Sequence, residues 1–279
     1  MGYPVQGING VVNSWSGTFQ SNLLSKMVAN AAVHNMSAAA AQVTGLNAAV
    51  ESYIPGVGTW EVTIGGTAFA SSRLGNQGLV AFSAGGYVYH VDSARVKIEA
   101  QVHDITAFAA TSPIWGRFMP GVSNWSATYR CRVDSANNVP IPHLAPTTSD
   151  GGASLPTVTF TYGKSNDATL AGSCMIDRVS PAIRRGDQVW VDIGVRGTGA
   201  LTPAGAGSIL GSTAFGQPEW DQGSSPPVST TQPSISFQAA TSRTYVGSCF
   251  WKSIELAWDV RSPVSIVVVA QGTGELVPS

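Results

Sequence analysis

Two segments near the C-terminal end of the chain recur at one fixed spacing, which favours a fold built from repeated units. The recurring landmarks are Gly172, Cys174, Gly197 and Gly199 in the first copy and Gly247, Cys249, Gly272 and Gly274 in the second. Each second-copy landmark follows its counterpart by 75 positions, since 247 minus 172 and 272 minus 197 both equal 75. Agreement of several landmarks at one spacing indicates a repeated structural unit.

A strand pattern lies between the landmarks of each copy. Branched aliphatic residues alternate there with other residues; they are Val189, Val191, Ile193 and Val195 in the first copy and Val264, Ile266 and Val268 in the second. Alternation with a period of two is typical of a strand that turns one face to a core. The Gly-Thr-Gly that follows each pattern predicts a turn or a bulge.

A second recurring segment lies nearer the N-terminus. Its landmarks are Thr44, Pro55, Gly56 and Trp60 in one copy and Thr106, Pro120, Gly121 and Trp125 in the other. The spacing from proline to tryptophan is five in both copies. We predict a strand after each tryptophan, over residues 60–64 and 125–133, and another over 95–102. The two tryptophans are predicted to be core residues.

Residues 23–42 give conflicting signals. Their Ala, Leu and Met content favours a helix, whereas aligning Thr44 with Thr106 places them on the strand predicted over 95–102. We predict a strand, because tertiary context overrides propensity. Short helices are predicted after each threonine, over residues 46–53 and 108–118.

The copies follow one another in the order front, front, back, back. The fronts span roughly 1–70 and 78–135, and the backs span 155–203 and 230–279. Loops rich in Pro, Gly and Ser separate them at 137–156 and 202–233. The simplest assembly is an all-β protein of two units from an internal duplication, with residues 76–205 inserted into a discontinuous unit of 1–75 plus 206–279. Exchange of pieces between neighbouring chains is the alternative.

The composition points to a surface that other subunits cover. Of the 279 residues, 43% are hydrophobic and only 11% are charged, less than half of the usual quarter. The net charge of -1 gives no basic footprint for nucleic-acid binding. Three widely spaced cysteines argue against a disulfide framework and fit a reducing cytoplasm. No signal peptide or membrane span is expected.

We expect no enzymatic activity, cofactor or metal. His34, His90, His103 and His143 are the only histidines and have no metal-binding spacing. There is no nucleophile elbow, phosphate-binding loop or dinucleotide motif. The tripeptide at 185–187 matches an adhesion motif but is ordinary turn chemistry before a strand.

The front segment over residues 102–134 resembles phage tail tube (major tail) proteins. In that family a strand ends in a Val-Thr-like pair, and a short helix, a Pro-Gly-hydrophobic-x-x-Trp turn and another strand follow. The residues that carry the resemblance here are Ile105, Thr106, Pro120, Gly121, Val122 and Trp125. The Gly-Thr-Gly-x-Leu sequences at 197–201 and 272–276 resemble the close of the family's last strand. Together the motifs touch most of the chain apart from its two long loops.

The resemblance implies β-sandwich or barrel units that line a tube. Family members with two fused units form three-membered rings with pseudo-sixfold symmetry, so the resemblance implies a trimer that stacks with copies of itself and contacts other tail proteins. DNA would pass through the lumen without specific binding, and the location would be the virion tail after assembly in the host bacterial cytoplasm. The alternatives are a tail hub, a tail terminator, a head decoration protein, or an all-β carbohydrate-binding or adhesin module.

Overall fold

The computed structural model describes most of the chain. The described residues are 11–15, 27–42, 53–68, 78–83, 87–106, 115–133, 155–162, 168–182, 188–205, 208, 210, 233–240, 243–260 and 262–279. Thr44 and His143 lie outside these ranges, as does most of each predicted helix. The described residues contain no helix, and therefore no helix of the length and apolar character needed to cross a membrane.

The described residues form an all-β fold of thirteen strands joined in one sheet. The strands are β1 (Val11–Trp15), β2 (Met27–Gln42), β3 (Tyr53–Ala68), β4 (Gly78–Phe82), β5 (Tyr87–Asp104), β6 (Phe118–Arg132), β7 (Thr157–Tyr162), β8 (Ala168–Ala182), β9 (Trp190–Gly197), β10 (Thr202–Ala204), β11 (Ser234–Ala240), β12 (Arg243–Asp259) and β13 (Ser262–Pro278).

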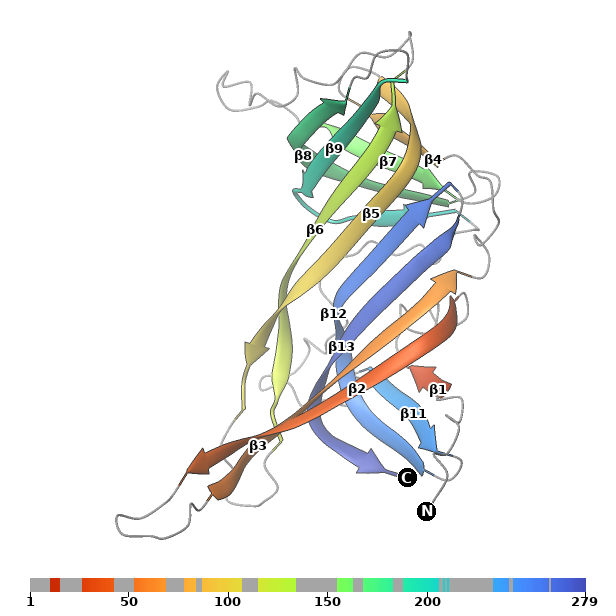
Figure 1. Ribbon diagram of the computed structural model, residues 1–279. Coiled ribbons are helices and arrows are strands. Elements are labelled where there is room, and N and C mark those ends of the chain that lie inside the picture. Colours follow the sequence, from red (N-terminus) through yellow and green to blue (C-terminus); the bar gives the residue numbers. More distant parts are fainter. Residues whose placement is uncertain are drawn as a thin grey trace, which may run out of the picture.

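Six of these strands close a barrel, seen at the top of Figure 1. β5, β4, β7, β8, β9 and β6 follow one another through antiparallel pairs, and β5 pairs with β6 again. Inward-facing side chains from all six strands are buried, among them Tyr89, Tyr129, Phe160 and Ile193. Because period-2 patterns place one face of each strand inside, the alternation in the sequence becomes the barrel core.

The other strands repeat the same order without closing. β2, β3, β13, β12, β11 and β1 are consecutive neighbours, but no pairing joins β1 to β2 among the described residues. In this open unit β2 corresponds to β5, β3 to β6, β13 to β9 and β12 to β8. The core includes Trp15, Ile64, Phe250 and Ile266.

The two units also share the positions of their irregularities. The register of β2 on β3 shifts between Ala38 and Ala40, and that of β5 on β6 shifts 62 positions later, between Ala100 and Val102. The register of β12 on β13 shifts between Trp251 and Ser253, and that of β8 on β9 shifts 75 positions earlier, at 176–178. A bulge bends a strand and reorients its side chains, so the two units bend alike.

Several sequence-based predictions can be compared with these elements. The strand predicted over 23–42 despite its helical propensity is confirmed over its described residues, 27–42, as β2. The strands predicted over 60–64 and 95–102 are confirmed within β3 and β5, and the strand predicted over 125–133 is confirmed up to residue 132 within β6. The prediction that Pro-Gly forms a turn is wrong. Pro55–Gly56 and Pro120–Gly121 lie inside β3 and β6, where each strand has one residue more than its partner β2 or β5, and this bulge supplies the bend.

The other corrections concern segment ends. The described ends of the predicted helices are extended, since Tyr53 begins β3 and Phe118 begins β6. The loop predicted over 202–233 begins with β10, which pairs with β8. Leu210 within that loop is buried, and most of the remaining loop lies outside the described residues.

Candidate assembly surfaces

Trp60 occupies a slot made by glycines on two neighbouring strands. Its indole Nε1 donates a hydrogen bond of 3.0 Å to the carbonyl oxygen of Gly274, whose φ is +75°. A Cβ on Gly272 or Gly247 would overlap the indole ring. Only glycine leaves room for the tryptophan at these two positions.

Trp125 occupies an equivalent slot in the barrel. Its Nε1 donates a hydrogen bond of 3.0 Å to Gly199, whose φ is +141°. A Cβ on Gly197 would overlap the ring, and one on Gly172 would lie 2.7 Å from it. Both tryptophans are 2% exposed, which confirms them as core residues. The predicted landmarks thus come together as two tryptophan–glycine slots.

The cysteine landmarks are buried beside these slots. Cys174 lies opposite Gly197 and Cys249 lies opposite Gly272. Burial raises the pKa of Cys174 to about 11 and raises the pKa values of Cys131 and Cys249 further. These free thiols stay protonated and serve as small apolar core groups.

Thr106 ties together the two ends of the segment that precedes β6. Its Oγ1 accepts a hydrogen bond of 2.8 Å from the backbone N–H of Arg117, and its own N–H donates to Asp104 Oδ1 at 2.8 Å. Hydrogen bonding with Thr106 lowers the pKa of the Asp104 carboxyl. Thr106 therefore links Asp104 at the end of β5 to Arg117, which directly precedes β6.

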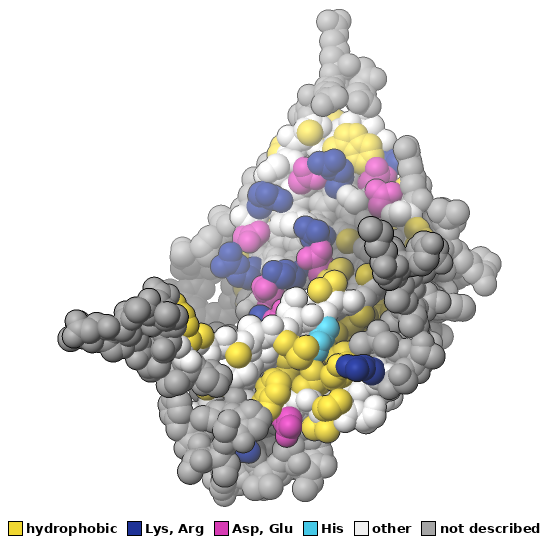
Figure 2. Space-filling view, turned by 60° about the horizontal axis from the view of Figure 1, so that its bottom comes forward, with side chains coloured by type: hydrophobic (Ala, Val, Ile, Leu, Met, Phe, Trp, Pro, Cys, Tyr) yellow, Lys and Arg dark blue, Asp and Glu magenta, His cyan; other side chains and the backbone are white. Residues whose placement is uncertain are grey.

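One face of the sheet carries six ion pairs among the described residues. They are Arg95–Glu255, Lys97–Glu99, Arg130–Asp192, Arg132–Asp92, Arg196–Asp177 and Lys252–Glu61. Figure 2 shows basic and acidic side chains intermixed across the molecule. We call this set the charge-balanced face, because each of its six ion pairs joins one cation to one anion. Sequence reasoning missed it, since pairs across strands depend on register.

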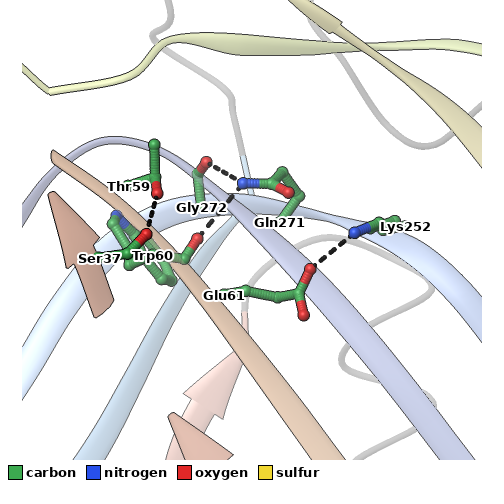
Figure 3. A network of polar contacts seen from close by, with 7 residues as sticks. All are labelled: Ser37, Thr59, Trp60, Glu61, Lys252, Gln271 and Gly272. Carbon is green, nitrogen blue, oxygen red and sulfur yellow. Dashed lines mark hydrogen bonds and ion pairs between the residues drawn. The ribbon is translucent and has the colours of Figure 1, made fainter. Parts of the chain in front are cut away.

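Polar contacts on this face join strands of the open unit (Figure 3). Lys252 Nζ lies 2.8 Å from Glu61 Oε2, which connects β12 to β3 across β13. The Gln271 amide is buried and donates to the carbonyl oxygens of Trp60 and Gly272. Ser37 and Thr59 hydroxyls are 2.8 Å apart between β2 and β3.

A joint connects the barrel to the open unit. Residues 93–99 of β5 pair with 253–259 of β12, and Arg95 Nη2 lies 2.8 Å from Glu255 Oε1 across it. The Phe118 N–H donates a hydrogen bond of 3.0 Å to Thr273 Oγ1, and the Gly274 N–H donates to the Gly116 carbonyl at 2.8 Å. We call these contacts the internal joint.

Two strand edges have no neighbouring strand among the described residues. β2 pairs only with β3, and residues 174–182 of β8 pair only with β9. The exposed side chains of β2 include Val33 at 54% and Met36 at 58% exposure. In Figure 1 the β2–β3 hairpin extends toward the lower left, away from the barrel. Unpaired edges of this kind are able to pair with another chain.

No group of three His, Cys, Asp or Glu side chains is placed to bind a metal ion in the described part of the chain. His34 packs against Phe237 with ring centroids 4.5 Å apart, and burial lowers its pKa. Its Nε2 has no hydrogen-bond partner among the described residues, and the half-buried ring packs on aromatic side chains.

No protein-family model matches the chain, and no curated protein is a significant match. Among solved structures, a chain described as "Virion of native gene transfer agent (GTA) particle" is similar, with 15% sequence identity and a TM-score of 0.36. The similarity covers 48% of this chain and 99% of that chain.

Proposed function

We propose that this chain is a structural virion protein that assembles with copies of itself into rings, which stack as the tail tube of a phage. The observation that carries the proposal is the pair of free edges on β2 and β8. A sheet that ends in two unpaired strands is liable to join another sheet. Two different edges on one chain allow head-to-tail association, which closes into a ring when the rotation permits.

The arrangement of the units supports a ring of three chains. We propose that residues 1–75 plus 206–279 and residues 76–205 are two tube-type units from an internal duplication, because their strand orders and bulges correspond. Eight strands run from one free edge to the other in the order β2, β3, β13, β12, β5, β6, β9, β8. Three chains would supply three times eight strands and six units with pseudo-sixfold symmetry.

The charge-balanced face suits the wall of a DNA conduit. A lumen with many unpaired cations would hold the phosphate backbone through counterion release. Six cations paired with six anions give no such net attraction. We therefore place this face toward the lumen, where DNA passes without specific binding.

The proposal includes no catalytic role, cofactor or membrane contact. The free edges, the glycine slots and the buried thiols all serve packing and pairing. Contacts with other tail proteins would occur at the ends of the tube, and assembly would take place in the bacterial cytoplasm, where buried thiols stay reduced.

Negative-stain electron microscopy with light scattering on the same sample tests the proposal. We expect rings or stacked tubes with threefold or pseudo-sixfold symmetry and a smallest particle of three times 28.9 kDa. Closed rings that never stack would favour a terminator or decoration protein. A monomer at every concentration would overturn self-assembly and favour a binding module.

A further inference from the structure

We propose that residues 178–182 of β8 in one copy pair antiparallel with residues 33–37 of β2 in the next copy, in the register that β12 and β5 use within the chain. This inference rests on the proposed self-assembly and specifies its interface. It starts from the internal joint, in which a front hairpin of one unit pairs with the back hairpin of the other.

The internal joint buries apolar side chains directly opposite one another. Ile98 of β5 faces Ile254 of β12, and they are 2% and 0% exposed. Val96 and Leu256 form the next such pair along the joint, at 2% and 5%. Burial of this kind contributes on the order of 25 cal/mol per Å² of apolar surface, so the joint is a hydrophobic contact with an ion pair above it.

Each side of the internal joint has a counterpart that is not paired. The bulges equate β5 with β2 at a spacing of 62 and β12 with β8 at a spacing of 75. The counterpart of Ile98 is Met36, and the counterpart of Ile254 is Val179. Met36 is 58% exposed where Ile98 is 2% exposed. Met36 therefore occupies a position that is buried in β5, but among the described residues no strand pairs with β2 there in the way that β12 pairs with β5.

A second part of the joint gives the same result independently. Thr273 is 7% exposed and accepts the hydrogen bond from Phe118. Its counterpart in the barrel, Thr198, is exposed. The counterpart of Phe118 is Tyr53, which is 56% exposed. Counterparts of both members of this contact are thus present a second time, and both are exposed.

The register follows from the two spacings. Met36 is opposite Val179, Val33 is opposite Ala182, and Ser37 is opposite Arg178. In the internal joint the same positions hold Ile98 and Ile254, Arg95 and Ala257, and Glu99 and Ser253. The proposed contact lacks a counterpart of the Arg95–Glu255 ion pair, because Val33 and Ser180 occupy those positions.

A second copy of this chain is the occupant that these surfaces fit. The internal joint shows that a strand with the geometry of β2 fits an edge with the geometry of β8, because their counterparts already pair. β2 and β8 lie at opposite ends of the eight-strand path, so each chain would use β8 toward one neighbour and β2 toward the other. Such a contact is heterologous, and a set of chains that leaves neither edge free must be a closed ring.

Intermolecular disulfide formation tests both the contact and its register. Opposed residues in an antiparallel pair have Cα atoms about 4.5 or 5.5 Å apart, and disulfides form at about 4.4–6.8 Å. The full chain carrying Met36→Cys and Val179→Cys, treated with oxidised glutathione, is expected to give a covalent ladder on a non-reducing gel that ends at the ring number. The native cysteines are buried and would not contribute.

The matched control moves one partner by a single residue. Met36→Cys with Ser180→Cys places the thiols on opposite faces of the sheet, because a one-residue shift reverses side-chain direction. That variant should assemble but give no ladder. Two single lysine variants give a separate comparison. Met36→Lys should abolish ring formation, whereas Val267→Lys on the central strand β13 should leave ring formation intact. Circular dichroism verifies that both variants fold.

The outcomes separate the two proposals. Rings in the wild type with a ladder from the first cysteine pair alone support the joint. Rings with no ladder, equal ladders from both pairs, or rings that survive Met36→Lys overturn this joint and leave self-assembly standing. A wild type that stays monomeric at every concentration overturns both.

Discussion

Trp60 lies so close to Gly272 that a Cβ at position 272 would overlap the indole ring. The same relationship holds between Trp125 and Gly197. Each tryptophan is anchored by one hydrogen bond from its Nε1 to the second glycine of the Gly-Thr-Gly sequence. The glycines are therefore fixed by a packing requirement, and the following predictions begin from it.

Replacing either slot glycine should destabilise the fold. Gly272→Ala and Gly197→Ala each force a methyl group into the space of an indole, and overpacking of this kind costs about 1–3 kcal/mol or more. Urea unfolding followed by tryptophan fluorescence measures the loss. Gly65→Ala is the control, because a Cβ there would meet nothing within 4 Å. A Gly272→Ala protein as stable as Gly65→Ala would contradict the slot.

The slots explain why their residues recur at fixed spacings in the sequence. Tryptophan, two spaced glycines and a cysteine recur because one packing arrangement recurs, so the spacing reports three-dimensional contact. β2 was predicted as a strand for the same reason, although its alanines favour a helix. Propensity amounts to less than about 1 kcal/mol per residue, and pairing along the whole of β3 outweighs it.

The contacts between the two units depend on which strands become neighbours, and the residue pattern of a single strand does not predict its neighbour. The pairing of β5 with β12 joins residues far apart in the sequence: Ile98 and Ile254 are 156 positions apart, since 254 minus 98 equals 156. The Arg95–Glu255 ion pair follows from that register. Met36 has the pattern of a core residue but is 58% exposed, and sequence periodicity does not reveal this difference.

Thr273 and Thr198 should respond differently to the same substitution. Thr273→Val keeps the shape but removes the acceptor for the Phe118 N–H, and an unmet partly buried donor costs about 1–3 kcal/mol. Thr198→Val should leave the stability of the isolated chain unchanged, because this side chain is exposed, and should weaken ring formation. Equilibrium unfolding and light scattering measure the two effects. Equal unfolding midpoints for both variants would count against the assignment.

The three cysteines should be almost inert in the folded protein. With the pKa of Cys174 raised to about 11, only about one thiol in a thousand is ionised at pH 8, and the thiolate is the reactive form. Labelling with Ellman's reagent should therefore be slow in buffer and complete in urea. Cys174 should react before Cys131 and Cys249, whose pKa values are raised further by burial. Rapid labelling of all three in the native state would show that the core packing is wrong.

His34 should make the fold less stable in acid. Burial against Phe237 and Trp60 lowers the pKa of His34 below its usual value of 6.5, so the unfolded chain binds this proton more readily than the folded chain. Its contribution to stability is fully present above pH 6.5 and is lost as the pH falls through 6.5 toward the folded-state pKa. Urea unfolding at pH 8 and pH 5 should show a lower free energy of unfolding at pH 5.

A substitution separates this effect from the titration of other groups. His34→Gln cannot take up a proton, so the difference between pH 8 and pH 5 should shrink in this variant even if its stability at pH 8 is reduced. His90→Gln, on the exposed face of β5, is the control and should keep the wild-type difference. If His34→Gln and the wild type lose the same stability between the two pH values, His34 is not the group that titrates.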